Sequence, residues 1–187
     1  MNKRQSIPFI LFLIAFLLWL YFKPEEILQE TAKHQPNYIA YNARNIHFNK
    51  TGKIAHKIFA DKTTSFPEQN ITLFKKPNVI VYIENKETNE PTVWQISSND
   101  GILYQQNKLI LTSDVRVENL SQDQLIQTMN TEKLTLLLEQ KEISSDLLVK
   151  WQGPQMQQQG IGMWASLITE ELIVKKAIKA VYLNENK

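Results

Sequence analysis

Residues 109–117 read Leu-Ile-Leu-Thr-Ser-Asp-Val-Arg-Val, and residues 143–149 read Ile-Ser-Ser-Asp-Leu-Leu-Val. In both stretches apolar side chains recur at alternate positions, which is the period of a β-strand with one buried face. Each stretch also carries a Ser-Asp pair near its middle, with Ser113 and Ser145 separated by 32 residues. The two stretches therefore predict long strands that belong to a repeating β-architecture.

The alternating pattern continues from Tyr38 almost to the end of the chain. Turn-forming residues interrupt it every 8–12 positions, for example at 49–52, 99–101 and 153–154. Many short strands at this spacing favour an all-β sandwich, barrel or jelly roll. Residues 131–142 contain several leucines, which also favour helix. We interpret them as strand because of the strands predicted on both sides.

Four segments share an apolar-x-small-polar pattern, and their small residues are Ala60, Ser98, Thr131 and Ala165. These residues are separated by 38, 33 and 34 positions. A period near 33 with two or more strands in each unit predicts stacked units, each covering its neighbour's apolar face. Chance is the alternative explanation, because the apolar-x-small pattern is common.

The N-terminus has a different character from the rest of the chain. Lys3 and Arg4 precede an uncharged and mostly apolar stretch over 5–22, which Lys23 ends. Eighteen residues make about 27 Å of helix, which is enough to span a bilayer. A cleaved signal peptide has the same order of charged and apolar residues, but it needs small residues before the cleavage site. Here that position holds bulky residues from Leu18 to Phe22, so an uncleaved anchor is favoured.

The flanking charges predict how this anchor is oriented. Basic residues stay on the cytoplasmic side of a span, so the remainder of the chain is translocated. We therefore expect a cytoplasmic N-terminus over 1–5, a transmembrane signal anchor over 6–23, a juxtamembrane linker over 24–37 and a β-domain over 38–187. This arrangement predicts a single-pass membrane protein whose main domain lies outside the cytoplasm.

Composition excludes several other classes of protein. The apolar share of 43% is too high for a disordered chain, and the absence of cysteine excludes a disulfide framework, a thiolate nucleophile and a cysteine-based zinc site. The net charge of +2 comes mostly from the three basic residues that flank the apolar stretch. Without them the 21 basic residues fall to 18, against 19 acidic residues. Nucleic acid is therefore not an expected partner.

An enzyme is also not expected. The chain has no glycine-rich phosphate loop, no Gly-x-Ser-x-Gly motif and no obvious carboxylate pair among its five aspartates. Of the histidines, His47 and His56 lie across a glycine turn and could face each other on a hairpin. No acidic cluster accompanies them, so we interpret them as paired surface histidines rather than metal ligands. No catalytic residue, metal or cofactor is predicted.

The N-terminal apolar segment is followed by Pro-Thr-Val-Trp-Gln-Ile at 91–96, by the strands over 108–117 and 144–153, and by Gly-Ile-Gly-Met at 160–163. In this order and spacing the chain resembles the LptC family, the bitopic inner-membrane components of lipopolysaccharide export in Gram-negative bacteria. The segment Thr112-Ser113-Asp114 departs from the family, whose members carry an aromatic residue followed by glycine there. This departure puts the local turn in doubt.

The resemblance implies a periplasmic, twisted antiparallel β-jelly roll of the OstA-like type, preceded by one transmembrane helix. It also implies a function in lipopolysaccharide transport from the inner to the outer membrane. The domain would accept lipopolysaccharide from the ABC transporter subunits LptB, LptF and LptG, and pass it to the soluble periplasmic bridge protein LptA. The alternative is a membrane-anchored periplasmic scaffold that binds proteins but carries no lipid.

The resemblance also assigns roles to individual residues. Phe74 matches an interior lipid-binding position, and Gly52, Gly153, Leu172 and Tyr182 match positions for partner binding or assembly. Plain core packing is the alternative for Phe74, Leu172 and Tyr182, and an ordinary turn is the alternative for the glycines.

Two further segments carry expectations of their own. The long strand predicted over 172–182 would make a C-terminal edge to which a partner strand could add, and its lysines discourage self-association. The glutamine-rich segment over 152–159 is expected to form a flexible polar loop.

Overall fold

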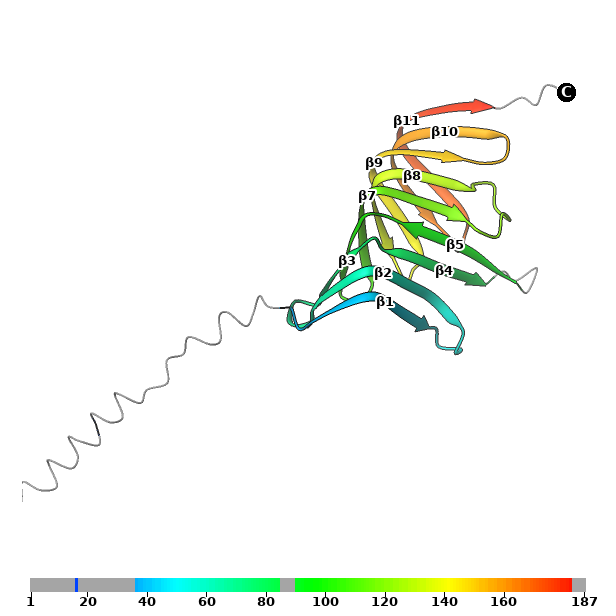
Figure 1. Cartoon of the computed structure of the whole chain (residues 1–187). Coiled ribbons are helices and arrows are strands. Elements are labelled where there is room, and N and C mark those ends of the chain that lie inside the picture. The colour runs from blue at the N-terminus through cyan, green and yellow to red at the C-terminus, as the bar shows by residue number, and fades with distance from the viewer. Residues whose placement is uncertain (1–15, 17–35, 85–89, 183–187) are drawn as a thin grey trace, which may run out of the picture. The chain divides into compact units, whose positions relative to one another are not determined.

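The computed structural model describes residue 16 and residues 36–84 and 90–182. In these ranges the chain forms eleven β-strands and one short 3₁₀ helix, η1 (Pro67–Gln69) (Figure 1). The strands are β1 (Tyr38–Phe48), β2 (Ile54–Phe66), β3 (Ile71–Lys75), β4 (Asn78–Glu84), β5 (Pro91–Ser97), β6 (Asp100–Tyr104), β7 (Lys108–Asn119), β8 (Thr128–Leu137), β9 (Glu142–Gln152), β10 (Met156–Ser166) and β11 (Glu171–Tyr182). The prediction of an all-β fold is confirmed.

Every strand pairing is antiparallel, and most strands pair with their neighbours in the sequence. The order across the sheet is β11-β10-β9-β8-β7-β5-β4-β2-β3-β6, with β1 beside β2 and an additional pairing of β6 with β7. Strands β1 and β11 therefore lie at opposite ends of the domain (Figure 1). Among the described residues each of these two strands pairs on one side only, so the domain has two open edges.

The long strands bend near their middle, and the Ser-Asp pairs mark these bends. Ser113 and Asp114 have positive φ angles of 66° and 57°, and the register between β7 and β8 shifts at this point. On one side of the bend β7 pairs with β6, and on the other side it pairs with β5. A two-residue bulge thus lies at this departure from the expected pattern and carries the strand from one layer to the other.

Neighbouring strands bend along the same line. Ser145 pairs with Met163, and the next two residues, Asp146 and Leu147, lie where the register between β9 and β10 shifts, opposite Gly162, whose φ is 72°. Asn42 in β1 and Ala177 in β11 also have positive φ angles, of 51° and 53°. The bends fold the sheet into two layers of strands that face each other, as in a jelly roll (Figure 1).

The layers enclose a core made of alternating residues from each strand. In β4 and β5 every second side chain is buried, as the period of two predicts. The fully buried large side chains lie mainly in the middle and second half of the domain, and include Ile96, Leu109, Leu111, Leu134, Leu136, Ile143 and Met163. Each such side chain stabilises the fold by about 1.5–3 kcal/mol through burial.

The four small residues of the repeat are all buried. Ala60, Ser98 and Thr131 lie beside the bends, where a small side chain fits between the two layers. Ala165 instead lies beyond the bend of β10, three residues after Gly162. Three of the four repeat residues therefore lie beside bends of the sheet, a relation that the repeat alone did not indicate.

Other expectations have mixed outcomes. The strand predicted over 131–142 is confirmed for 131–137, within β8, but residues 138–141 form the turn between β8 and β9. The predicted loop in the glutamine-rich segment is wrong, because Gln157, Gln158 and Gln159 lie in β10 and pair with both β9 and β11. Strand pairing satisfies their backbone while Gln157 points to solvent, so their polar side chains do not prevent a strand.

The predicted anchor over 6–23 and most of the predicted linker lie outside the described residues, apart from residue 16. In the described part of the chain, no helix has the length and apolar character needed to cross a membrane.

Candidate functional site

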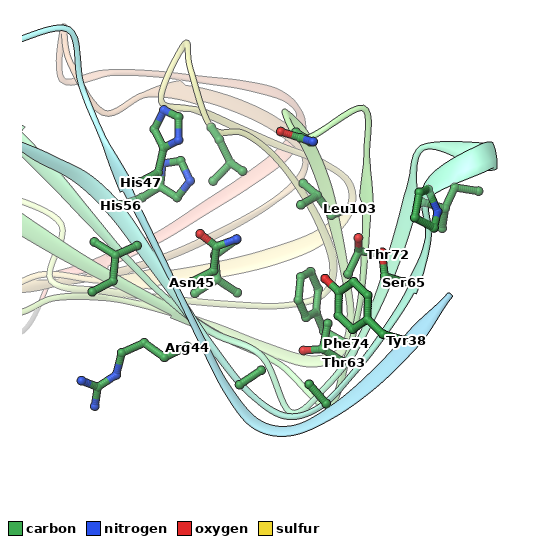
Figure 2. Close-up of a pocket in the computed structure, with 18 of the residues that line it drawn as sticks. Tyr38, Arg44, Asn45, His47, His56, Thr63, Ser65, Thr72, Phe74 and Leu103 are labelled. Atoms are coloured by element: carbon green, nitrogen blue, oxygen red, sulfur yellow. The ribbon is translucent and has the colours of Figure 1, made fainter. Parts of the chain in front are cut away.

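A cavity of about 730 Å³ opens at the β1 end of the domain (Figure 2). Strands β1, β2 and β3 form most of its wall, and Leu103 of β6 and Leu138, just after β8, close the opposite side. It is lined by Tyr38, Ala40, Ala43, Arg44, Asn45, Ile46, His47, His56, Ile58, Thr63, Ser65, Pro67, Asn70, Ile71, Thr72, Phe74, Leu103, Gln106 and Leu138. The interior of the jelly roll is thus filled by core side chains in its middle and hollow at this end.

The wall of the cavity combines an apolar surface with hydroxyl groups. Ile58, Phe74 and Leu138 are among its buried apolar side chains. The Oγ1 atom of Thr63 is also buried, and it has no hydrogen-bond partner among the described residues. A buried hydroxyl without a partner carries a desolvation penalty, so a ligand with both apolar and polar groups suits this wall.

Phe74 faces this cavity, as Figure 2 shows. It is the buried residue of β3 and pairs with Thr63 of β2 on one side and Gly101 of β6 on the other. A Cβ atom on Gly101 would lie 3.6 Å from the Cβ of Phe74 and 3.0 Å from Pro77 Cγ, so the glycine leaves room for both side chains. The structure places Phe74 in the interior, as expected, and its contact with lipid remains a prediction.

His47 and His56 lie directly opposite each other on the β1–β2 hairpin. Their rings stack with centroids 4.8 Å apart and an interplanar angle of 12° (Figure 2). His47 is exposed, as predicted, but the prediction is wrong for His56, which is buried against the core side of β2. Burial, followed by the charges of His47 and Lys141, lowers the pKa of His56 to about 4. In the described ranges no group of three acidic, histidine or cysteine side chains could hold a metal ion.

Gly52 lies in the turn that joins β1 to β2. Its φ is 79°, a left-handed conformation that favours glycine, and its N–H donates to the carbonyl of Asn49 at 3.0 Å. The side-chain oxygen of Asn49 accepts further hydrogen bonds from the backbone of Thr51 and Lys53. The predicted hairpin turn is confirmed, and Gly52 is at the same end of the domain as Phe74.

The other three predicted residues lie at the opposite end. Gly153 has no positive φ, and its N–H donates to Met156 O at 2.9 Å. A Cβ atom there would lie only 2.1 Å from Leu125 O, so the glycine permits a close approach of two backbone segments. Leu172 pairs with Ala165 and packs partly against the core, while Tyr182 pairs with Met156 at the end of β11.

One residue near the cavity was missed by the sequence analysis. Lys141 lies in the turn between β8 and β9, and its Nζ donates to the carbonyl oxygen of Tyr82 at 2.5 Å. Tyr82 is far away in the sequence, on β4. A single lysine in a polar turn has no recognisable pattern, so only the folded arrangement of the two layers reveals this contact.

We compared the sequence and the fold of this chain with those of known proteins. The chain is 25% identical over 199 residues to the lipopolysaccharide export system protein LptC of Haemophilus influenzae, covering 97% of this chain and 95% of the relative. LptH of Pseudomonas aeruginosa, an LptA-homologous periplasmic component of the lipopolysaccharide transport device, has a similar fold. The match has a TM-score of 0.50 at 8% identity and covers 81% of this chain and 98% of LptH. The profile of the LptC-related lipopolysaccharide-assembly family matches residues 8–183, and the chain therefore belongs to the LptC family.

Proposed function

We propose that this protein carries lipopolysaccharide from the inner membrane toward the outer membrane through the interior of its jelly roll. The observation that carries the proposal is the cavity of about 730 Å³ at the β1 end, in a chain of the LptC family. Acyl chains gain roughly 0.8 kcal/mol for each methylene that they bury. A hollow between two apolar layers is therefore a favourable place for several chains of a lipid.

The two open edges support a relay along a line of similar domains. β1 and β11 each have one unpaired side among the described residues, and an unpaired strand can accept a strand of another protein. We propose that the β1 end receives lipid from the ABC transporter subunits LptB, LptF and LptG. The β11 end then passes it to soluble LptA, whose strand would add beside β11. The exposed Lys175, Lys176 and Lys179 of β11 would discourage self-association.

The residue proposals follow the same direction. Phe74 would contact the acyl chains because it faces the cavity. Tyr182 and Leu172 lie near opposite ends of the outermost strand, β11, and Leu172 packs partly against the core, so their proposed role is to form the docking edge. Gly153 would support assembly by allowing the tight packing beside Leu125. Gly52 would shape the turn at the receiving end.

The proposed arrangement in the cell includes the single-pass anchor over 6–23, with a cytoplasmic N-terminus and a periplasmic β-domain. The chain has no nucleotide-binding motif, so a partner ATPase would supply the energy for transport. In this proposal the protein is a carrier and not an enzyme.

Binding experiments with the full chain in detergent test this function. The carrier proposal predicts saturable binding of lipopolysaccharide and a separate complex with the soluble jelly-roll partner. The scaffold alternative predicts the partner complex without lipid binding. Gly153→Arg is expected to reduce recovery of the partner complex in co-purification, because a large side chain has no room beside Leu125. Absence of lipopolysaccharide binding by the wild-type chain would overturn the proposal.

A further inference from the structure

Lys141 joins the two layers of the jelly roll in the turn that also supplies the lining residue Leu138, and we call this position the rim of the cavity. It belongs to the turn between β8 and β9, and Leu138 of the same turn lines the cavity. Its amine donates to Tyr82 O on β4, a strand that pairs only with β2 and β5 in the described sheet. The hydrogen bond therefore crosses from one layer to the other, where no backbone pairing joins them.

Two ionisable side chains lie near this amine: His56, which lines the cavity, and Glu84. His56 lines the cavity and is close enough for the charge of Lys141 to lower its pKa. Glu84 acts on Lys141 in the opposite direction, but its carboxylate is already paired with Lys53 at 3.0 Å. Lys141 is half-buried, and this burial lowers the pKa of its amine.

The Lys141 amine forms a weaker hydrogen bond with its present acceptor than it would form with an anionic oxygen. In the described part of the chain, the one hydrogen bond of the Lys141 amine goes to a neutral carbonyl. Bonds between a cation and an anionic oxygen are roughly twice as strong as neutral ones, and a partly buried position strengthens them further. An anionic oxygen at this rim would therefore displace Tyr82 O.

We propose that Lys141 binds the phosphate of an anionic amphiphile whose acyl chains occupy the cavity, and that its amine leaves Tyr82 O for this phosphate. In the free protein the same amine holds the two layers together at the rim. Ligand entry then breaks this contact and replaces it with one to the lipid. The inference rests on the proposed lipid-carrier function and adds the residue that recognises the headgroup.

The test compares the full-length wild type with Lys141→Met and Lys141→Arg, using lipopolysaccharide with and without its lipid phosphates. Methionine keeps the apolar stem and removes the charge, whereas arginine keeps the charge. Lys150→Met is the matched control, because Lys150 is an exposed lysine of β9 outside the cavity lining. Circular dichroism spectra of all variants check that each is folded.

Loss of a charged hydrogen bond of about 1.5–3 kcal/mol corresponds to binding weaker by about tenfold or more. We expect this loss for Lys141→Met with phosphorylated lipid only, with binding largely retained in Lys141→Arg and unchanged in Lys150→Met. Inorganic phosphate alone is expected not to compete at millimolar concentration, because it has no acyl chains to bury.

Three results would contradict the inference. Unchanged affinity of Lys141→Met for phosphorylated lipid removes Lys141 from headgroup binding. An equal loss with phosphorylated and dephosphorylated lipid makes its role structural only. Competition by inorganic phosphate would show a free-anion site instead of an amphiphile site. All three require that the wild type binds lipopolysaccharide, so they are distinct from failure of the proposed function.

Discussion

Substitution of Gly153 by alanine is a small change with a large expected effect. The alanine Cβ would lie 2.1 Å from Leu125 O and 3.5 Å from Met156 Cε. The close contact is with a backbone atom, so a rotamer change cannot relieve it. Either the segment that contains Leu125 or the turn after β9 must move, and the turn is held by the hydrogen bond from Gly153 N to Met156 O at 2.9 Å.

The cost can be estimated from similar overpacked sites. Adding a carbon to a well-packed site destabilises a protein by about 1–3 kcal/mol. In a domain of this size that corresponds to a decrease of roughly 3–10 °C in the melting temperature. The comparison variant is Gly52→Ala, where a Cβ would meet no atom within 4 Å but φ is 79°. Backbone strain alone should cost Gly52→Ala about 1 kcal/mol.

Thermal unfolding of the full-length variants, followed by tryptophan fluorescence, measures both effects. Trp151 is buried two residues before Gly153, so the signal reports on the affected region. We expect Gly153→Ala to melt at a lower temperature than Gly52→Ala. A Gly153→Ala variant as stable as the wild type would refute the close-approach explanation for this glycine.

Three further predictions concern the core, a bend and a titrating side chain. Leu136→Ala removes a fully buried side chain and should lower the free energy of unfolding by about 2–5 kcal/mol, measured by urea unfolding. Leu147→Ala, at an exposed position of β9, should change it by less than about 0.5 kcal/mol. Equal effects of the two substitutions would contradict the assigned core. Thr131→Val removes the hydroxyl that donates to Leu148 O at 2.9 Å, and should cost about 1 kcal/mol in the same assay, so unchanged stability would exclude that bond as a support for the bend. The folded pKa of His56, about 4, lies below its ordinary value of 6.5, so the unfolded chain binds more protons between these values and stability falls as the pH decreases from about 6.5 to 4. His56→Gln should show a shallower decrease of melting temperature from pH 7 to pH 5, and a slope equal to that of the wild type would contradict the burial of a neutral imidazole.

The sequence predicts the strands well because burial on one face leaves a period of two in the chain. The bends were not predicted, although Ser113-Asp114 lies in the bulge of β7 and Ser145-Asp146 adjoins the register shift of β9. A short polar side chain tolerates the positive φ that such a bulge requires. Local patterns therefore predicted the class of the fold, whereas the line along which the sheet folds became clear only from the structure.

Contacts between distant segments cannot be predicted in this way. The burial of His56 depends on the layer that packs over β2, and the lack of space at Gly153 depends on where Leu125 O lies. The contact of Lys141 with Tyr82 joins residues 59 positions apart. The strand at 157–159 also forms against its polar composition, because β9 and β11 supply pairing on both sides.

Site-specific photo-crosslinking at two neighbouring positions tests the central claim most directly. Phe74 faces the cavity with 6% of its surface exposed, while the adjacent Leu73 is 38% exposed and points to the opposite face of β3. A photo-reactive residue at each position would be irradiated in the full-length protein in the presence of lipopolysaccharide. A lipid adduct from position 74 and none from position 73 is the result that an interior path predicts. Equal adducts from both positions, or adducts from position 73 alone, would show that the lipid does not travel through the interior of the jelly roll.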